Sequence, residues 1–149
     1  MNSVVFKNAH ILDVERGEIL AEKNVLVVDG KIKEITNSPI SAAPNAQVVD
    51  VRGRVLMPGL CDAHVHAASA TSSFQELQGW SSFYAASRMI DVLKGMLYRG
   101  FTTVRDAGGA DYGMAAAVEE GYVVGPRILF CGKALSQTGG HGDMRGPGD

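Results

Sequence analysis

Two histidines, two positions apart, are the residues of this chain whose type and spacing best suit chemistry. His64 and His66 end residues 58–66, which read PGLCDAHVH. Because successive side chains of a strand point to opposite faces, both imidazoles share one face if this run is extended. Neutral imidazole is a common zinc ligand, bound at about 2.0–2.1 Å. The spacing therefore predicts that the pair binds one metal ion, with a hydrogen-bonded pair on a sheet as the alternative.

Three other polar side chains lie in or beside expected strands. Asp62 shares the face of the histidines and could orient one of them as a hydrogen-bond acceptor, or make a structural hydrogen bond. Asp106 follows a β-branched run at residues 101–105, where a polar role near the site competes with a loop or helix-cap hydrogen bond. His10 lies among N-terminal β residues, and we expect it at the surface.

The elements that position these side chains fall into two parts, and the first reads as β structure. Asp29 and Gly30 separate the apolar runs at residues 24–28 and 31–35. This arrangement predicts a hairpin, because both turn residues tolerate positive φ. Further strands are expected at residues 4–6, 47–51 and 54–56, with a loop over residues 38–45.

After residue 58, expected strands and helices alternate. The first strand is followed by a helix that Ser81 or Ser82 begins and Gly100 ends. The apolar residues of that helix recur at three- and four-residue spacing. They are Phe83, Ala86, Ile90, Leu93 and Leu97.

Two more strands are expected at residues 101–105 and 127–131. Between them, Asp111 can cap a second helix and Gly121 can end it. Strands separated by helices predict parallel pairing, and hence an α/β fold for this second part.

Residues 58–66 match every fixed position of the pattern Pro-Gly-Leu-x-Asp-x-His-x-His, and so resemble the first barrel strand of the amidohydrolase superfamily. The resemblance implies an α/β fold in which residues 58–149 form the first three βα units of a TIM-type barrel. Residues 1–57 would then be the N-terminal part of a small β-sandwich domain. A closed barrel has eight strands and eight helices, so the fold is expected to be incomplete as given.

The same resemblance implies a metal centre. His64 and His66 would bind the more buried ion of a mono- or binuclear site, with one or two divalent ions and Zn²⁺ as the expected metal. The other ligands, and the aspartate that acts as general base, would come from later barrel strands. No catalytic residue is therefore expected within this segment, and Lys133, just past the third strand, is not assigned a bridging role.

A glycine-rich segment at residues 137–145, QTGGHGDMR, resembles a loop of one amidohydrolase subgroup. That subgroup contains imidazolonepropionase-like proteins and dipeptidases that remove a C-terminal proline or basic residue. The resemblance implies that His141 faces the substrate carbonyl or carboxylate, with an exposed loop histidine as the alternative. Arg145 could pair with a substrate carboxylate, or lie in solvent. The segment around Asp106 resembles the same subgroup.

Charge and composition limit the classes of partner that this chain is expected to bind. A formal charge of −2 gives no reason to expect nucleic acid or an anionic membrane. The N-terminus lacks the pattern of a signal peptide, and no apolar stretch has the length of a membrane span. Cys61 and Cys131 lie in apolar runs, which predicts buried free thiols and a cytoplasmic protein. The expected partner is a small molecule or a dipeptide, and homo-oligomerisation stays open.

Three functions compete at this point. The first is the N-terminal part of a metal-dependent amidohydrolase, which cleaves a C–N bond of a small substrate, preferably a dipeptide, with metal-activated hydroxide. The second is a truncated, non-catalytic module that binds metal or a partner. The third is a deaminase or cyclic amidase of the same superfamily. The second would be favoured if the natural protein ended at residue 149, and a substrate profile separates the third from the first.

Overall fold

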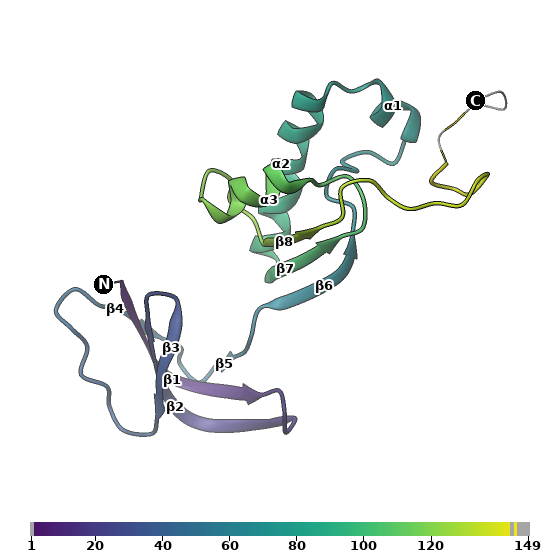
Figure 1. The fold of residues 1–149 in the computed structure, drawn as a ribbon. Coiled ribbons are helices and arrows are strands. Elements are labelled where there is room, and N and C mark those ends of the chain that lie inside the picture. Colours follow the sequence, from purple (N-terminus) through teal and green to yellow (C-terminus); the bar gives the residue numbers. More distant parts are fainter. Residues whose placement is uncertain (1, 144, 146–149) are drawn as a thin grey trace. The chain divides into compact units, whose positions relative to one another are not determined.

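The chain folds into two units, Met1–Pro58 and Gly59–Asp149 (Figure 1). They are seen in a computed structural model that describes residues 2–143 and 145. Among these residues, no helix combines the length and apolar character that crossing a membrane requires.

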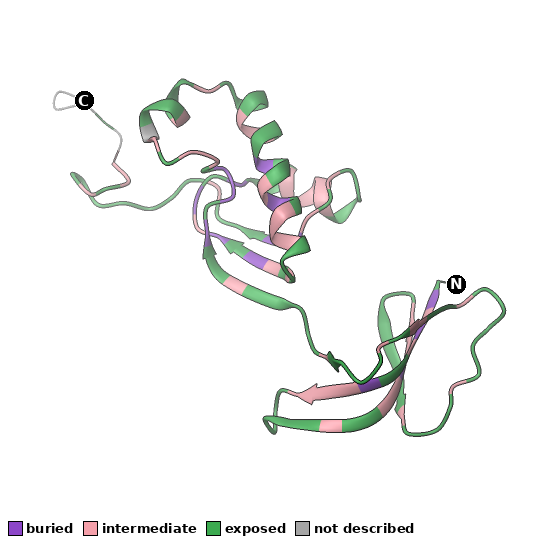
Figure 2. Ribbon diagram, turned by 180° about the vertical axis from the view of Figure 1, so that it is seen from behind, coloured by how far each residue is buried: buried purple, intermediate pink, exposed green. Residues whose placement is uncertain are grey.

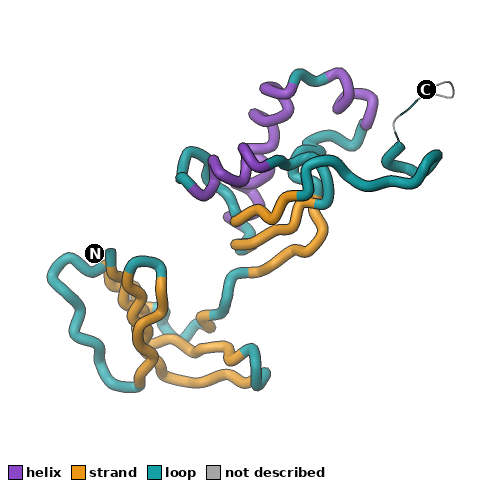
Figure 3. Tube along the Cα trace, in the orientation of Figure 1, coloured by secondary structure: helices purple, strands orange, loops and turns teal. Residues whose placement is uncertain are grey.

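The first unit is a single mixed sheet (Figure 3). Its strands run in the order β3-β2-β1-β4. The short strand β5 also pairs with β1, along a later part of that strand than β4 does. β1 is antiparallel to β2, whereas β4 and β5 are parallel to β1. The strands are β1 (Ser3–Asp13), β2 (Glu18–Val28), β3 (Lys31–Thr36), β4 (Gln47–Asp50) and β5 (Val55–Leu56).

The predicted hairpin is confirmed. Antiparallel strands β2 and β3 meet at Asp29 and Gly30, whose φ angles are +48° and +75°. The first strand is longer than its apolar run suggests, since it continues to Asp13 and pairs with the start of β2. The Asp13 carboxylate closes that second turn by accepting the backbone N–H groups of Glu15 and Arg16.

The second unit places three parallel strands in the order β6-β7-β8. Helices lie between consecutive strands, as the alternation predicts. The elements are β6 (Leu60–Val65), α1 (Phe74–Gly79), α2 (Ser82–Tyr98), β7 (Phe101–Asp106), α3 (Tyr112–Glu119) and β8 (Arg127–Phe130).

Both predicted helices are confirmed, with their caps. The Ser81 hydroxyl accepts the N–H of Tyr84 at the start of α2, and the Asp111 carboxylate accepts the N–H of Met114 at the start of α3. Gly100 follows α2 with a φ of +94°, a conformation that favours glycine. The short helix α1 was not predicted, because its two apolar residues, Phe74 and Leu77, are too few to define a helical period.

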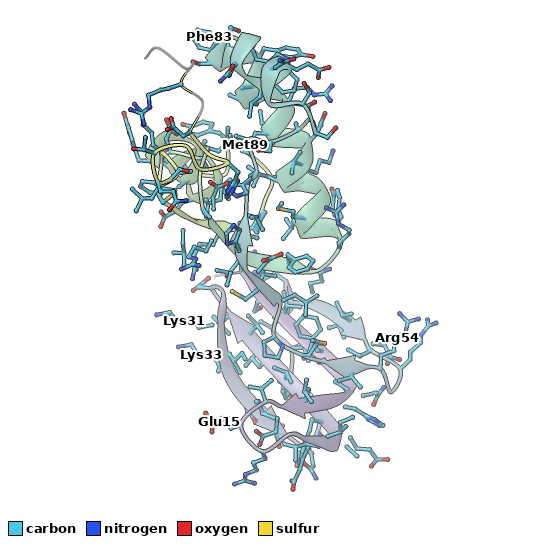
Figure 4. The ribbon with its side chains drawn as sticks, turned by 90° about the vertical axis from the view of Figure 1, so that its right-hand side faces the viewer. Glu15, Lys31, Lys33, Arg54, Phe83 and Met89 are labelled. Atoms are coloured by element: carbon cyan, nitrogen blue, oxygen red, sulfur yellow. The ribbon has the colours of Figure 1, made fainter. Side chains whose placement is uncertain are left out.

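The face that α2 buries matches the predicted one only in part, since Leu93 belongs to both. Met89 and Leu93 are buried, whereas Ile90 is 38% exposed and Phe83 is 88% exposed. Figure 4 labels Met89 along the helix and Phe83 near its start. The apolar side chains of α2 are more numerous than one stripe requires, so their spacing alone allowed two overlapping faces.

The core of the second unit lies between α2 and the sheet, where Figure 2 shows the buried residues in purple. The strands contribute Val65, Val104 and Ile128, and the helix contributes Met89 and Leu93. Residues of the loops after β6 and β7 complete it. They are Ala67, Ala68 and Ala110.

The two cysteines are free, as predicted, but the prediction that they are buried is wrong. Cys61 shares the parity of the buried Val65 but lies at the opposite end of β6. Cys131 follows the last residue of β8. Both strands are outer strands of this sheet, and Cys131 lines a cavity on the side of the sheet that carries His64.

Candidate metal centre

The strand β6 brings the two histidines to the edge of the sheet where all three parallel strands end (Figure 1). His64 is the penultimate residue of β6, and His66 follows the strand directly. Val65 stands between them and is buried in the helix-covered core. By alternation, the histidines therefore occupy the opposite, open face.

The two imidazoles meet through their Nε2 atoms, which are 3.3 Å apart. The ring centroids are 5.2 Å apart and the ring planes are inclined by 76°. Two Zn–N bonds of about 2.0–2.1 Å at a tetrahedral angle would separate their nitrogens by about 3.3 Å. The separation of the two nitrogens therefore matches that of two ligands on one tetrahedral ion. A hydrogen bond between the two rings would give a similar separation, so this distance alone fits both interpretations.

A contact on the far side of the His66 ring bears on that choice. Nδ1 of His66 lies 3.0 Å from the carbonyl oxygen of Gly108. A carbonyl can only accept, so Nδ1 carries the hydrogen, and Nε2 of the neutral ring keeps its lone pair. Metal-binding histidines commonly have such an acceptor, which sets both the tautomer and the ring orientation. His66 is thus held in the form that a ligand requires.

The Asp106 carboxylate is fully buried at the end of β7. It accepts three backbone N–H groups, from Ala67 at 2.7 Å, Gly108 at 2.9 Å and Ala110 at 3.1 Å. These donors belong to the loops that follow β6 and β7. Asp106 therefore makes loop hydrogen bonds, and its connection to both sides of His66 was not foreseen from the sequence.

The other two candidate residues, Asp62 and His10, make hydrogen bonds that involve backbone groups. Asp62 accepts the backbone N–H of His64 at 3.0 Å, and so contacts the main chain of that histidine rather than its ring. His10 belongs to the first unit, where it is half-buried in β1. The backbone N–H of His10 donates to the carbonyl of Arg54.

The described part of the glycine-rich segment, residues 137–143 and 145, lies in a loop after β8 that leads away from the sheet (Figure 1). His141 is exposed in this loop. The Asp143 carboxylate closes the loop by accepting the N–H of Gly139 at 2.9 Å. No hydrogen bond links His141 to the histidine pair among the residues that the structure describes.

Arg145 pairs with its own loop. Its guanidinium donates from Nε and Nη2 to the two oxygens of Asp143, each at 2.7 Å. This bidentate pair and the Gly139 N–H hold the pKa of Asp143 far below its ordinary value, and the carboxylate raises the pKa of Arg145. A substrate carboxylate would have to compete with Asp143 for this cation.

An open cavity of about 590 Å³ lies beside His64 on the same side of the sheet. Its lining includes Arg105, Phe130, Cys131 and Lys133, which come from the ends of β7 and β8. Arg105 is partly fixed there, since its Nε donates to the carbonyl of Ala63 at 2.6 Å. The cavity has room for a small molecule next to the histidine pair.

Within residues 2–143 and 145, no third His, Cys, Asp or Glu joins His64 and His66 in a cluster that could hold an ion. The donors described are therefore two imidazole nitrogens. A four-coordinate ion would need further ligands from water, substrate or other protein groups.

Comparison with known proteins identifies relatives of this chain. A model of the amidohydrolase family matches residues 55–148, more than half of the chain. Among solved structures, a prolidase crystallised with N-methylphosphonate-L-proline is 47% identical to this chain, with a TM-score of 0.91. The match covers 99% of this chain and 36% of the prolidase.

Curated relatives match over a shorter stretch. Ochratoxinase from Aspergillus niger is 37% identical over 93 residues, which are 60% of this chain and 19% of that protein. Dihydroorotase from Bacillus cytotoxicus is 38% identical over 100 residues, which are 67% of this chain and 20% of that protein. The matched part of the chain thus spans about a fifth of the length of these relatives.

Proposed function

The chain belongs to the amidohydrolase family, and from that premise we propose that it forms the N-terminal part of a metal-dependent enzyme that hydrolyses a C–N bond in a small substrate. Residues 58–149 would supply the first three βα units of a TIM-type barrel. Residues 1–57 would supply part of a β-sandwich domain. The extent of the match to the prolidase, about a third of that chain, supports this assignment.

The observation that carries the proposal is the geometry of the histidine pair. The 3.3 Å between the Nε2 atoms of His64 and His66 matches the separation of two ligands on a tetrahedral ion, about 3.3 Å. The Gly108 carbonyl leaves the lone pair of His66 Nε2 available. We assign Zn²⁺ or a similar divalent ion to this pair, in a site of one or two metals.

When bound, such an ion supplies a Lewis acid for a carbonyl and lowers the pKa of a water molecule toward 7. In this chain, His64 and His66 would hold the ion, and the cavity beside His64 would receive the substrate. The remaining ligands and the general base would come from parts of the whole protein outside these residues. His141 would contact the substrate from the loop after β8.

A dipeptide is the proposed substrate, because the prolidase is similar over nearly the whole chain. A cyclic amide is the second candidate, since the similarity to a dihydroorotase points to that class. We propose no nucleic acid or membrane partner. A cytoplasmic location and homo-oligomerisation stay predictions.

Substrate profiling of the whole protein tests this function. Purified protein loaded with Zn²⁺ should hydrolyse dipeptides with a C-terminal proline or basic residue, and should lose that activity when the metal is removed by a chelator. Turnover of cyclic amides without turnover of dipeptides would favour the second candidate. Absence of both activities in the metal-loaded protein would favour the non-catalytic module.

A further inference from the structure

The buried carboxylate of Asp106 connects the two loops that surround His66. We propose that Asp106 is a positioning residue, which fixes the ring of His66 in the tautomer and orientation that metal binding needs. The inference rests on the proposed function, since it assigns a purpose to Asp106 only if His66 is a ligand. Within the part of the chain that the structure describes, Asp106 makes no hydrogen bond to either ring of the histidine pair.

The first step of the argument is the placement of the three donors. Oδ2 of Asp106 accepts the N–H of Ala67, the residue that follows His66. Oδ1 accepts the N–H groups of Gly108 and Ala110. One carboxylate thus holds the main chain next to His66 with one oxygen and the β7 loop with the other.

The second step is what that loop does for the ring. The carbonyl of Gly108 is the acceptor of the His66 Nδ1–H, at 3.0 Å. Gly108 therefore bonds to Asp106 through its N–H and to His66 through its C=O. If Asp106 released this residue, the imidazole would lose its acceptor, and the Nε2–H tautomer, which cannot bind a metal through Nε2, would become accessible.

The third step is the tight packing around this connection. A Cβ atom on Gly109 would lie 2.6 Å from Cβ of Ala68, and one on Gly108 would lie 2.6 Å from Cβ of Ala134. The loops after β6, β7 and β8 therefore touch at these glycines. The Gly109 N–H also donates to the carbonyl of Gly132 at 2.8 Å. The carbonyl that receives His66 is thus part of a packed set of loops.

The fourth step is why a carboxylate is needed. Two oxygens with about four lone-pair sites can accept three N–H groups from opposite sides. Asparagine has one carbonyl oxygen, and its NH₂ group would face a backbone donor. Asp106→Asn must therefore lose either the hydrogen bond from Ala67 or those from Gly108 and Ala110. The first loss frees the main chain next to His66, and the second frees the residue whose carbonyl accepts from the ring.

The test compares Asp106→Asn with Asp111→Asn in the whole protein. Asp111 lies in the same loop region and accepts a single N–H, from Met114, as the cap of α3. Asparagine is an equally good cap, so this control removes a nearby charge without touching His66. Two properties are measured: the tautomer of His66 in the apoprotein, from ¹⁵N NMR of the imidazole nitrogens, and the affinity for Zn²⁺.

We expect the wild type and Asp111→Asn to show the Nδ1–H tautomer and the same zinc affinity. Asp106→Asn should show a mixture of tautomers and bind Zn²⁺ about 10–100-fold more weakly, the usual range for residues behind a metal ligand. A folded Asp106→Asn protein with the wild-type tautomer and affinity would overturn the proposal. If that variant does not fold, the wild-type apoprotein decides: the Nδ1–H tautomer supports the proposal, and the Nε2–H tautomer overturns it.

Failure of the proposed function has a different signature. If His66→Ala leaves zinc binding unchanged, His66 is not a ligand and the metal assignment itself fails. If His66→Ala abolishes binding while Asp106→Asn changes neither tautomer nor affinity, the metal assignment stands and only the role of Asp106 is wrong.

Discussion

The hydrogen bond from His66 to the carbonyl of Gly108 sets the tautomer of that ring, and with it the interactions that the histidine pair can make. With Nδ1–H engaged at 3.0 Å, the ring keeps a lone pair on Nε2, which lies 3.3 Å from Nε2 of the other imidazole. The alternative, a hydrogen bond between the rings, requires His64 to donate through its Nε2–H. The two interpretations thus differ in the tautomer of His64, which an added ion would displace to Nδ1–H.

At the same scale, the exposed His141 is predicted to act on substrate and not on metal. His141→Ala in the whole protein should leave the zinc content unchanged. If the imidazole hydrogen-bonds the developing oxyanion, kcat should fall by about 10²–10³-fold. If it only anchors the substrate, KM should rise instead. Steady-state kinetics on dipeptides, and on a neutral amide without a carboxylate, distinguishes these cases.

Unchanged kinetics on every substrate would return His141 to the status of an exposed loop residue. Loss of zinc would mean that it is a ligand after all. His10→Ala is the matched control, because His10 belongs to the first unit.

The ion pair of the same loop gives a prediction about pH. Arg145 depresses the folded-state pKa of Asp143, so the pair stabilises the loop at pH values above the unfolded pKa of about 3.9. That contribution is lost as the pH falls toward the lower folded pKa. In Arg145→Ala, the pKa of Asp143 should rise, which a ¹³C NMR titration of its carboxyl group would detect. An identical titration in the variant and the wild type would show that the pair does not persist in solution.

At the scale of elements, α2 should contribute to stability through Leu93 rather than through Phe83. Leu93 is fully buried between α2 and the sheet, whereas Phe83 is 88% exposed. Leu93→Ala should cost about 2–5 kcal/mol of unfolding free energy, and Phe83→Ala should stay within about 0.5 kcal/mol of the wild type. Urea unfolding measures both. Equal losses in the two variants would mean that Phe83 is also buried in solution, contrary to its 88% exposure.

Local signals made several elements predictable. Asp29 and Gly30 specify a hairpin, and Ser81 and Asp111 specify helix starts, because each acts on neighbours within three residues. The buried face of α2 was not predictable in the same way. Met89 and Ile90 are both apolar and adjacent, so only contact with the sheet decides which of them is buried.

The candidate site likewise combines features that the local sequence predicts with features that it does not. The shared face of His64 and His66 follows from strand alternation, which is a property of the local sequence. The role of Gly108 does not, because it is 42 residues from His66 in the chain. Asp106 is likewise 39 residues from Ala67. Nothing in either local segment specifies these partners, so they are known only once the strands are paired.

At the scale of the whole molecule, the isolated 149-residue chain should show no amidase activity. The other ligands and the general base are proposed to lie outside it. It should also associate, because β6 and β8 are outer strands and apolar residues such as Leu129 and Phe130 are about half exposed. Sedimentation velocity and thermal unfolding test this. A monodisperse monomer with a cooperative transition would favour the independent-module interpretation.

The central claim is that His64 and His66 together hold a divalent ion, and the zinc stoichiometry of the whole protein tests it most directly. Apoprotein should be titrated with Zn²⁺ in the wild type, in His64→Ala, in His66→Ala and in the control His10→Ala. We predict that either site variant loses at least one bound ion or binds it far more weakly, while the control matches the wild type. Wild-type stoichiometry and affinity in both His64→Ala and His66→Ala would contradict the account.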